Sequence, residues 1–162
     1  MFGKNRPARR RLPLAVVDRL LPASGELTDL VAAFAAHRNR PVHLLPLDIG
    51  PGALSGLWIS TDDADYIGYP RTASPERVCA IVCHEIGHAL LGHEHLDLAE
   101  QLLRAGHFRA LPPDLVRSTL AARHGYDTPE EKDAELLGTR LSSGLRRRLE
   151  RGGDRFTDER WN

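Results

Sequence analysis

Two histidines and a glutamate stand close together in the segment His84-Glu85-Ile86-Gly87-His88, which has the pattern H-E-x-x-H. On an α-helix such histidines lie one turn above one another, so His84 and His88 can direct two imidazole nitrogens at one metal ion. Glu85 is offset from them and can reach the water that a catalytic zinc keeps. Zinc lowers the pKa of that water from about 15.7 towards about 7, so the pattern indicates metal-assisted hydrolysis with Glu85 as general base.

The residues around the motif predict that it lies on a buried helix. Ser74-Pro75-Glu76 supplies a capping serine, a proline at the first helical position and an acid in the first turn, and an apolar segment runs from there to Gly92. Burying His84, Glu85 and His88 in such a segment is costly without a partner such as a metal. The alternative is a hydrogen-bonded pair of buried histidines with Glu85 as a salt-bridge partner.

A catalytic zinc also needs a third protein ligand and one open position. His93 and His95 are the nearest further histidines. The metzincin pattern H-E-x-x-H-x-x-G-x-x-H is excluded by register, because it requires glycine and histidine where this chain has Leu91 and Glu94. Carboxylates on a later helix are the other source of a ligand, and residues 131–135 form the obvious cluster.

The segment 82–93, taken together with Glu131-x-Asp133-Ala134-Glu135-Leu136-Leu137, resembles the ImmA/IrrE family of zinc metallopeptidases. The family pattern in the second segment is E-x-E-A-N-x-F-A, and its first glutamate is the third zinc ligand. The resemblance covers about residues 25–141 and is specific at the two motifs. It implies the zinc ligands His84, His88 and Glu131 and the catalytic base Glu85.

The second segment departs from the family pattern. Asp133 replaces glutamate, Glu135 asparagine, Leu137 phenylalanine and Gly138 alanine, and the usual Met-Pro ending is absent after Leu141. His88 and Glu131 are 43 residues apart, which is longer than in the short members of the family, so we expect an extra helical segment between these ligands. These differences concern the inference about the substrate more than the inference about the metal site.

Two alternatives concern the third ligand. Glu131 stands three residues after Thr128, where it fits a capping box that needs no metal. Glu135, one turn further on, is the second candidate ligand and otherwise a partner that orients a ligand.

Apolar spacing and turn residues predict the elements that position the motif. A helix capped by Ser24 ends before Arg38-Asn39-Arg40-Pro41, and strands follow at residues 42–48, 54–60 and 65–69. After the motif we expect a short helix at 98–103, a helix from Pro112-Pro113 to about Gly125, and a last helix from Thr128. The last helix presents an apolar face formed by Ala134, Leu137 and Leu141.

These elements predict one α+β domain of zincin type over residues 21–145, with a small sheet packed on the H-E-x-x-H helix and further C-terminal helices. Residues 1–20 are expected to form a flexible basic arm, and residues 146–162 a fraying, arginine-rich tail. The net charge is zero, with 22 basic and 22 acidic residues. Solvated tails therefore explain the basic ends better than direct nucleic-acid binding does.

Composition narrows the class of protein. Among 162 residues, 41% are hydrophobic and 27% charged, as in an ordinary globular chain. Two cysteines cannot build a disulfide framework, and no apolar run is long enough to cross a bilayer. The basic N-terminus has no apolar core behind it, so we expect no secretory signal, no membrane partner and a cytoplasmic location.

Some other residues have less definite roles. Cys79 and Cys83 share a helix face, either as small buried apolar residues or as a redox-sensitive pair. His93 and His95 fit exposed loop positions, and the alternative is that they line the mouth of the site or order a ligand. An oxyanion-stabilising donor is needed and the sequence does not identify it. Its candidates are Tyr66, Tyr69, His124 and Tyr126.

The predicted function is zinc-dependent hydrolysis of a peptide bond. The family resemblance implies a cytoplasmic regulatory protein as substrate, typically a helix-turn-helix repressor whose cleavage derepresses stress genes or a mobile element. The alternative is a zinc-stabilised module that controls a transcription regulator by binding it without cleavage. Such a module needs His84, His88 and Glu131 but has no need of Glu85. The sequence does not indicate an oligomeric state.

Overall fold

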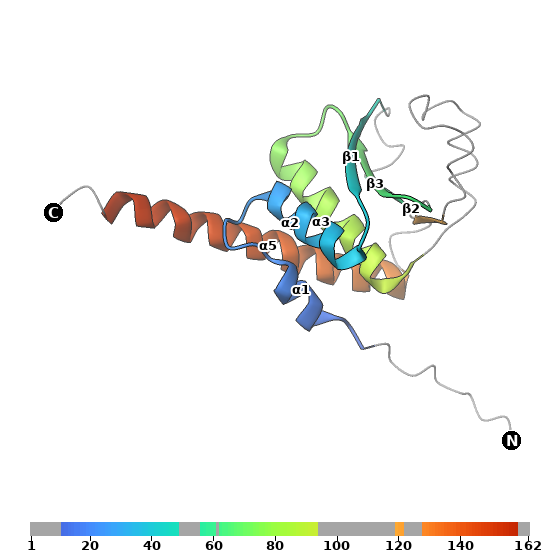
Figure 1. Cartoon of the computed structure of the whole chain (residues 1–162), viewed down its shortest axis with the longest axis horizontal. Coiled ribbons are helices and arrows are strands. Elements are labelled where there is room, and N and C mark those ends of the chain that lie inside the picture. The colour runs from blue at the N-terminus through green and yellow to red at the C-terminus, as the bar shows by residue number, and fades with distance from the viewer. Residues whose placement is uncertain (1–10, 49–55, 61, 94–118, 122–127, 159–162) are drawn as a thin grey trace, which may run out of the picture.

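The computed structural model describes residues 11–48, 56–60, 62–93, 119–121 and 128–158. Within these residues, helices and a small sheet form an α+β arrangement in which α3 (Pro75–Leu91) lies between the sheet and the long helix α5 (Pro129–Asp158) (Figure 1). Two shorter helices, α1 (Leu14–Leu20) and α2 (Leu27–Arg38), complete the helical side. The class α+β is therefore confirmed.

The described part of the sheet has four strands in the order β1-β3-β2-β4. Strand β1 (Val42–Leu47) runs parallel to β3 (Asp65–Pro70), which pairs antiparallel with β2 (Leu57–Ser60). Three of these strands match the predicted runs within a few residues. The fourth, β4 (Thr119–Ala121), pairs antiparallel with β2 and lies where a helix was expected. That prediction is therefore wrong at residues 119–121, while the rest of residues 112–125 and the helix expected at 98–103 lie outside the described residues.

Helix α3 begins and ends as its sequence predicts. The Ser74 side chain accepts a hydrogen bond from the Arg77 backbone N–H at 3.3 Å, Pro75 occupies the first turn, and Gly92 ends the helix in the left-handed conformation. Residues 81–89 are all buried, because the helix is covered by the sheet on one side and α5 on the other. The prediction of a buried helix is confirmed.

Helix α5 continues well past the end predicted for it. The expected apolar face of Ala134, Leu137 and Leu141 is buried, but Leu145 extends it by another turn and the helix ends only at Asp158. The fraying tail predicted from residue 146 is therefore wrong as far as Asp158. Glycines at 144 and 152 lie within this helix, so glycine alone does not end it.

Part of the N-terminal segment predicted as a flexible arm is ordered on α5. Val17 and Leu20 of α1 are buried, and Asp18 forms two hydrogen bonds with Arg140 at 2.7–2.8 Å. The α1 helix thus belongs to the packed domain, because its apolar residues Val17 and Leu20 are buried in the same core cluster as Leu145 of α5.

Helix α2 starts later than its predicted cap. Its N-cap is Glu26 rather than Ser24, whose hydroxyl accepts from the Glu26 N–H and donates to Asp29. The helix includes Arg38, one residue more than predicted, and Asn39 follows it in the left-handed conformation. In the described part of the chain, no helix combines the length and apolar character needed to cross a membrane.

A buried carboxylate joins α2 to the sheet. Asp65, at the start of β3, is fully buried and accepts from Arg38 Nε at 2.8 Å, Arg40 Nη1 at 3.3 Å and Ser60 Oγ at 2.7 Å. These three donors come from the end of α2, the turn after it and the end of β2. Asp65 therefore fixes how the helix and strands meet, a role that strand periodicity alone does not reveal.

Candidate metal centre

Helix α3 presents both motif histidines to the same space. His84 is 4% exposed and His88 is 3% exposed, and their Nε2 atoms lie 2.8 Å apart. Their rings meet edge to face with centroids 4.6 Å apart. The helical spacing thus produces the convergent pair of imidazoles that the motif predicts.

Glu131 from α5 completes a group of three. Its Oε1 lies 3.1 Å from His88 Nε2, and its Oε2 lies 3.5 Å from His84 Nε2. The three ligand atoms all lie within 4.8 Å of one another, and all three residues are buried. The structure therefore brings together the three residues that the family resemblance implies as ligands.

The capping role of Glu131 and its place in this group are compatible. Thr128 Oγ1 accepts a hydrogen bond from the backbone N–H of Glu131 at 3.2 Å, so the residue takes part in the N-terminal cap of α5 through its main chain. Its carboxylate meanwhile contacts the histidines. The cap sets where α5 starts, and so places the carboxylate in the first turn of the helix.

Two glycines allow α3 and α5 to approach closely enough for this contact. A Cβ added to Gly87 would lie 2.7 Å from the Ala134 carbonyl oxygen, and one added to Gly138 would lie 2.8 Å from His84 Cα. Both obstacles are backbone atoms, which cannot move aside alone. Gly138, noted above as a departure from the family pattern, thus lies directly against the residue that begins the motif.

The Nδ1 atoms of His84 and His88, which point away from the group of three, each lie close to a polar side chain. His84 Nδ1 lies 3.2 Å from Glu135 Oε2, and His88 Nδ1 lies 3.1 Å from His93 Nδ1. Glu135 therefore contacts the nitrogen that points away from the group of three and is not one of its members. His93 is 8% exposed, so the prediction of an exposed loop position is wrong for this residue. His95 lies outside the described residues.

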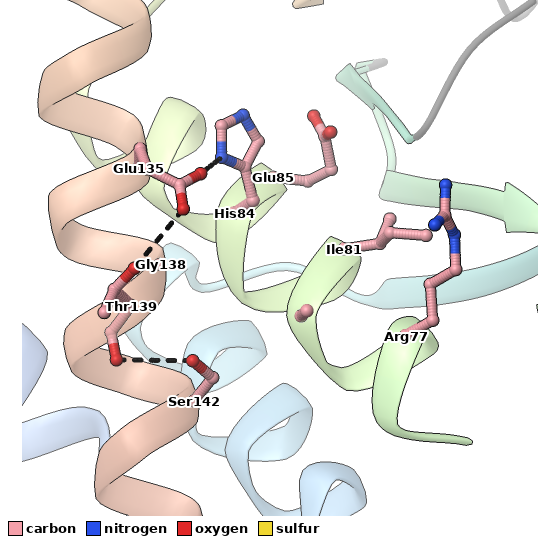
Figure 2. A pocket seen from close by; sticks show the side chains of 9 residues that line it. Arg77, Ile81, His84, Glu85, Glu135, Gly138, Thr139 and Ser142 are labelled. Atoms are coloured by element: carbon pink, nitrogen blue, oxygen red, sulfur yellow. Dashed lines mark hydrogen bonds and ion pairs between the residues drawn. The ribbon is translucent and has the colours of Figure 1, made fainter. Parts of the chain in front are cut away.

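Glu85 lies beside the group of three rather than within it. It is 1% exposed, and its Oε1 packs so closely on the start of β2 that a Cβ added to Gly56 would lie 2.7 Å away. Figure 2 shows its side chain extending next to the His84 ring, where both line a pocket between α3 and α5. Glu85 thus has the offset that the motif predicts for a base.

The pocket has a volume of about 250 Å³ and opens beside the two motif residues (Figure 2). Besides these, α3 contributes Arg77, Ala80 and Ile81, and α5 contributes Glu135, Gly138, Thr139 and Ser142. Pockets for drug-sized ligands have volumes of about 300–1,000 Å³, and this pocket is below that range. No pocket at this place could be predicted from the sequence, because the residues that α3 and α5 contribute to its walls are at least 50 positions apart.

The donor set and its spacing fit a zinc ion. Two imidazole nitrogens and a carboxylate oxygen form one of the usual ligand sets of catalytic zinc, and tetrahedral bonds of about 2.0–2.2 Å place such atoms about 3.3–3.5 Å apart. The contacts His84–His88, His88–Glu131 and His84–Glu131 are 2.8, 3.1 and 3.5 Å. The group could therefore share one small ion after shifts of a few tenths of an ångström.

The two cysteines of α3 are free thiols. The Cys83 thiol donates a hydrogen bond that lowers the pKa of Cys79 to about 7 against the opposing effect of burial, and the same bond together with burial raises the pKa of Cys83. Cys83 lies in the apolar core and Cys79 packs against it. This placement agrees with the prediction of small apolar packing residues.

The structure describes two of the four candidate oxyanion donors, Tyr66 and Tyr69. Tyr66 packs its ring on His43 of the neighbouring strand, with centroids 5.2 Å apart, and neither Tyr66 nor Tyr69 is among the described residues that line the pocket. His124 and Tyr126 lie outside the described residues. The donor for a developing oxyanion therefore stays unassigned.

Comparisons with protein-family models, with curated proteins and with solved structures found no match to this chain. What the chain does must accordingly be inferred from its motifs and from the geometry of this site. A proposed function must account for the three buried residues His84, His88 and Glu131 and for the buried carboxylate of Glu85 beside them.

Proposed function

We propose that the protein is a zinc-dependent endopeptidase. The observation that carries the proposal is the convergence of His84, His88 and Glu131 with Glu85 held beside them in a pocket wall. A bound zinc ion supplies a Lewis acid and lowers the pKa of water enough to make a nucleophile at neutral pH. Among the described residues the group offers three ligands, whereas a purely structural zinc site closes all four positions with protein ligands.

The chain's own residues divide the remaining work. Glu85 would take a proton from the attacking water and return it to the leaving amine, since its carboxylate is close to the histidines but is not one of the three ligands. Burial of Glu85 strengthens its electrostatic interactions because little water screens them. The pocket between α3 and α5 would hold a substrate side chain next to the reacting carbonyl.

The resemblance of the two motifs to the ImmA/IrrE family supports a regulatory protein as substrate, with a helix-turn-helix repressor as the leading candidate. A cytoplasmic location belongs to the same proposal. Retention of Glu85 favours cleavage over simple binding, because a module that only binds its partner needs the three ligands and not the base.

The test combines metal content with cleavage of a candidate repressor. We expect about one zinc per chain in the wild-type protein and in Glu85→Gln, and loss of zinc in His84→Ala and Glu131→Ala. Repressor cleavage should stop in all three variants. Removing a general base typically slows a reaction by about 10²–10⁴-fold.

The outcomes separate the candidate functions. A wild-type chain that holds no metal would contradict the peptidase and the zinc site together. Zinc bound without cleavage, with the repressor retained in a stable complex, would instead favour the zinc-stabilised binding module.

A further inference from the structure

The backbone turn that ends α3 contacts the proposed ligand His88. Gly92 adopts φ 65° and ψ 37°, and its N–H donates to the Ala89 carbonyl at 3.2 Å. The next N–H, that of His93, donates to the His88 carbonyl at 3.1 Å. These two bonds form a Schellman motif, which reverses the chain direction directly after the helix.

The reversal brings the His93 side chain back onto the helix it has just left. Its Nδ1 lies 3.1 Å from His88 Nδ1, and the two rings meet at 64° with centroids 5.3 Å apart. Both side chains are buried, so surrounding atoms restrict their rotation. The same turn therefore contacts His88 twice, once at its carbonyl and once at its ring.

We propose that Gly92 and His93 act together as a positioning device that sets the ring orientation and tautomer of His88 for metal binding. His88 Nε2 faces Glu131. When Nε2 binds a metal, the remaining hydrogen of the neutral ring is on Nδ1, and His93 Nδ1 lies 3.1 Å from that atom as an acceptor. The proposal rests on the metal site of the proposed function, but it does not require peptidase activity.

Gly92 is part of this device because of its backbone conformation. Residues other than glycine and asparagine are disfavoured at positive φ, and a β-branched residue is strongly disfavoured. A substitution that displaces the turn would withdraw His93 from His88 although neither Gly92 nor His93 is a proposed ligand. Substituting Gly92 is therefore expected to change the metal affinity. The identity of the three ligands alone does not predict this change.

The test measures affinity for Zn²⁺ and Co²⁺ alone, by competition with a chromogenic chelator, together with the Co²⁺ absorption spectrum. We expect His93→Leu and Gly92→Val to weaken affinity by about 10–100-fold, the usual effect of losing a group that orients a ligand. His93→Asn keeps an acceptor near the Nδ1 position and Gly92→Asn tolerates the left-handed conformation. Both should stay close to the wild type.

Asn39→Val is the matched control, because Asn39 ends α2 in the same left-handed conformation at φ 53°. It should lower the unfolding temperature, as Gly92→Val does, without changing metal affinity or the Co²⁺ spectrum. Wild-type affinity in His93→Leu, or equal affinity in Gly92→Val and Asn39→Val, would overturn the positioning role alone. A wild-type chain that binds neither metal would overturn this proposal and the zinc site together.

Discussion

Glu131 and Glu135 are one helical turn apart, but they differ in burial and in the atoms that they contact. The Glu131 side chain is 11% exposed and contacts the Nε2 atoms of both histidines, whereas that of Glu135 is 69% exposed and contacts the Nδ1 atom of His84. A buried carboxylate between two imidazoles needs a cation or proton to offset its desolvation. An exposed carboxylate does not, so Glu135 is suited to orienting a ligand.

This difference predicts unequal effects of the same substitution. Glu131→Gln should lose tight zinc binding, because it removes the negative ligand. Glu135→Gln keeps an amide oxygen that can accept from His84 Nδ1, so it should weaken zinc affinity by about tenfold or less. Chelator competition on the two purified variants measures both effects. Equal losses in the two variants would contradict the assignment of Glu131 as the ligand.

Asp65 illustrates a different role for a buried acid. Its carboxylate is completely buried and accepts from two arginines and a serine, so the residue is satisfied by donors from the chain itself. Its partners Arg38 and Arg40 keep about a quarter of their side-chain surface exposed. Its purpose is structural, in contrast to Glu131.

Asp65→Ala should therefore destabilise the fold without changing the metal site. Removing one partner of a buried ion pair typically costs about 3–5 kcal/mol. We expect about 3 kcal/mol here, because the arginines left behind can reach water. Urea unfolding of the metal-free protein provides the measurement, and zinc affinity at low temperature provides the control. A large change in zinc affinity would show that Asp65 also serves the site.

At the scale of elements, the contact between α3 and α5 decides whether the third ligand is in place. Gly87 and Gly138 let the two helix backbones meet, and the described part of the pocket is formed by the same two helices. A small sideways shift of α5 would move Glu131 away from His84 and His88. The site therefore depends on the position of α5 relative to α3.

Gly138→Ala tests this dependence. The added Cβ would lie 2.8 Å from His84 Cα, so the backbones must separate, and overpacking of this kind typically costs about 1–3 kcal/mol. We expect both a lower stability by urea unfolding and weaker zinc binding. Gly152→Ala is the matched control in the same helix, because nothing lies within 4 Å of its added Cβ. It should raise stability by about 0.5–1 kcal/mol and leave zinc binding unchanged.

At the scale of the whole molecule, the N-terminal segment and the C-terminal helix hold one another in place. Figure 1 shows α5 extending past the other elements, and α1 packs against it. Asp18 pairs with Arg140, and Arg148 donates to the Leu21 carbonyl oxygen. Residues more than 120 positions apart thus contact each other, and these contacts hold α1 against α5.

The Asp18–Arg140 pair predicts a small pH effect on stability. The hydrogen bond from Arg140 holds the pKa of Asp18 below its ordinary value of 3.8. The unfolded chain lacks this bond, so the stabilisation is fully present above about pH 4 and is lost as the pH falls through the lower folded pKa. Asp18→Asn should therefore melt slightly below the wild type at about pH 6, and the difference should vanish at low pH.

Thermal unfolding of both proteins across this pH range measures the effect. Raising the salt concentration should also reduce the difference at about pH 6, because both side chains are exposed to solvent. A difference that persists unchanged in strong acid would mean that Asp18 acts through packing rather than through its charge.

The sequence by itself determined the features that depend on neighbours along the chain. Helix α3 follows from Ser74, Pro75, the apolar run and Gly92, and the shared face of His84 and His88 follows from helical periodicity. The strands of β1 to β3 were likewise predictable within a few residues. Each of these is a local property, because backbone dihedrals and side-chain periodicity are set within one or two turns.

Only the tertiary structure decided which distant groups meet. The choice between Glu131 and Glu135, the burial of His93 against His88, and the pocket wall on α5 all depend on how closely α3 and α5 pack. The length of α5 was missed for the same reason. Its C-terminal turns carry Arg146-Arg147-Arg148 and look like a solvated tail, but Leu145 is buried in the same core cluster as Val17 and Leu20 of α1, and Arg148 donates to the Leu21 carbonyl oxygen. Burial against a partner far along the chain supplies the free energy that local propensity does not reveal.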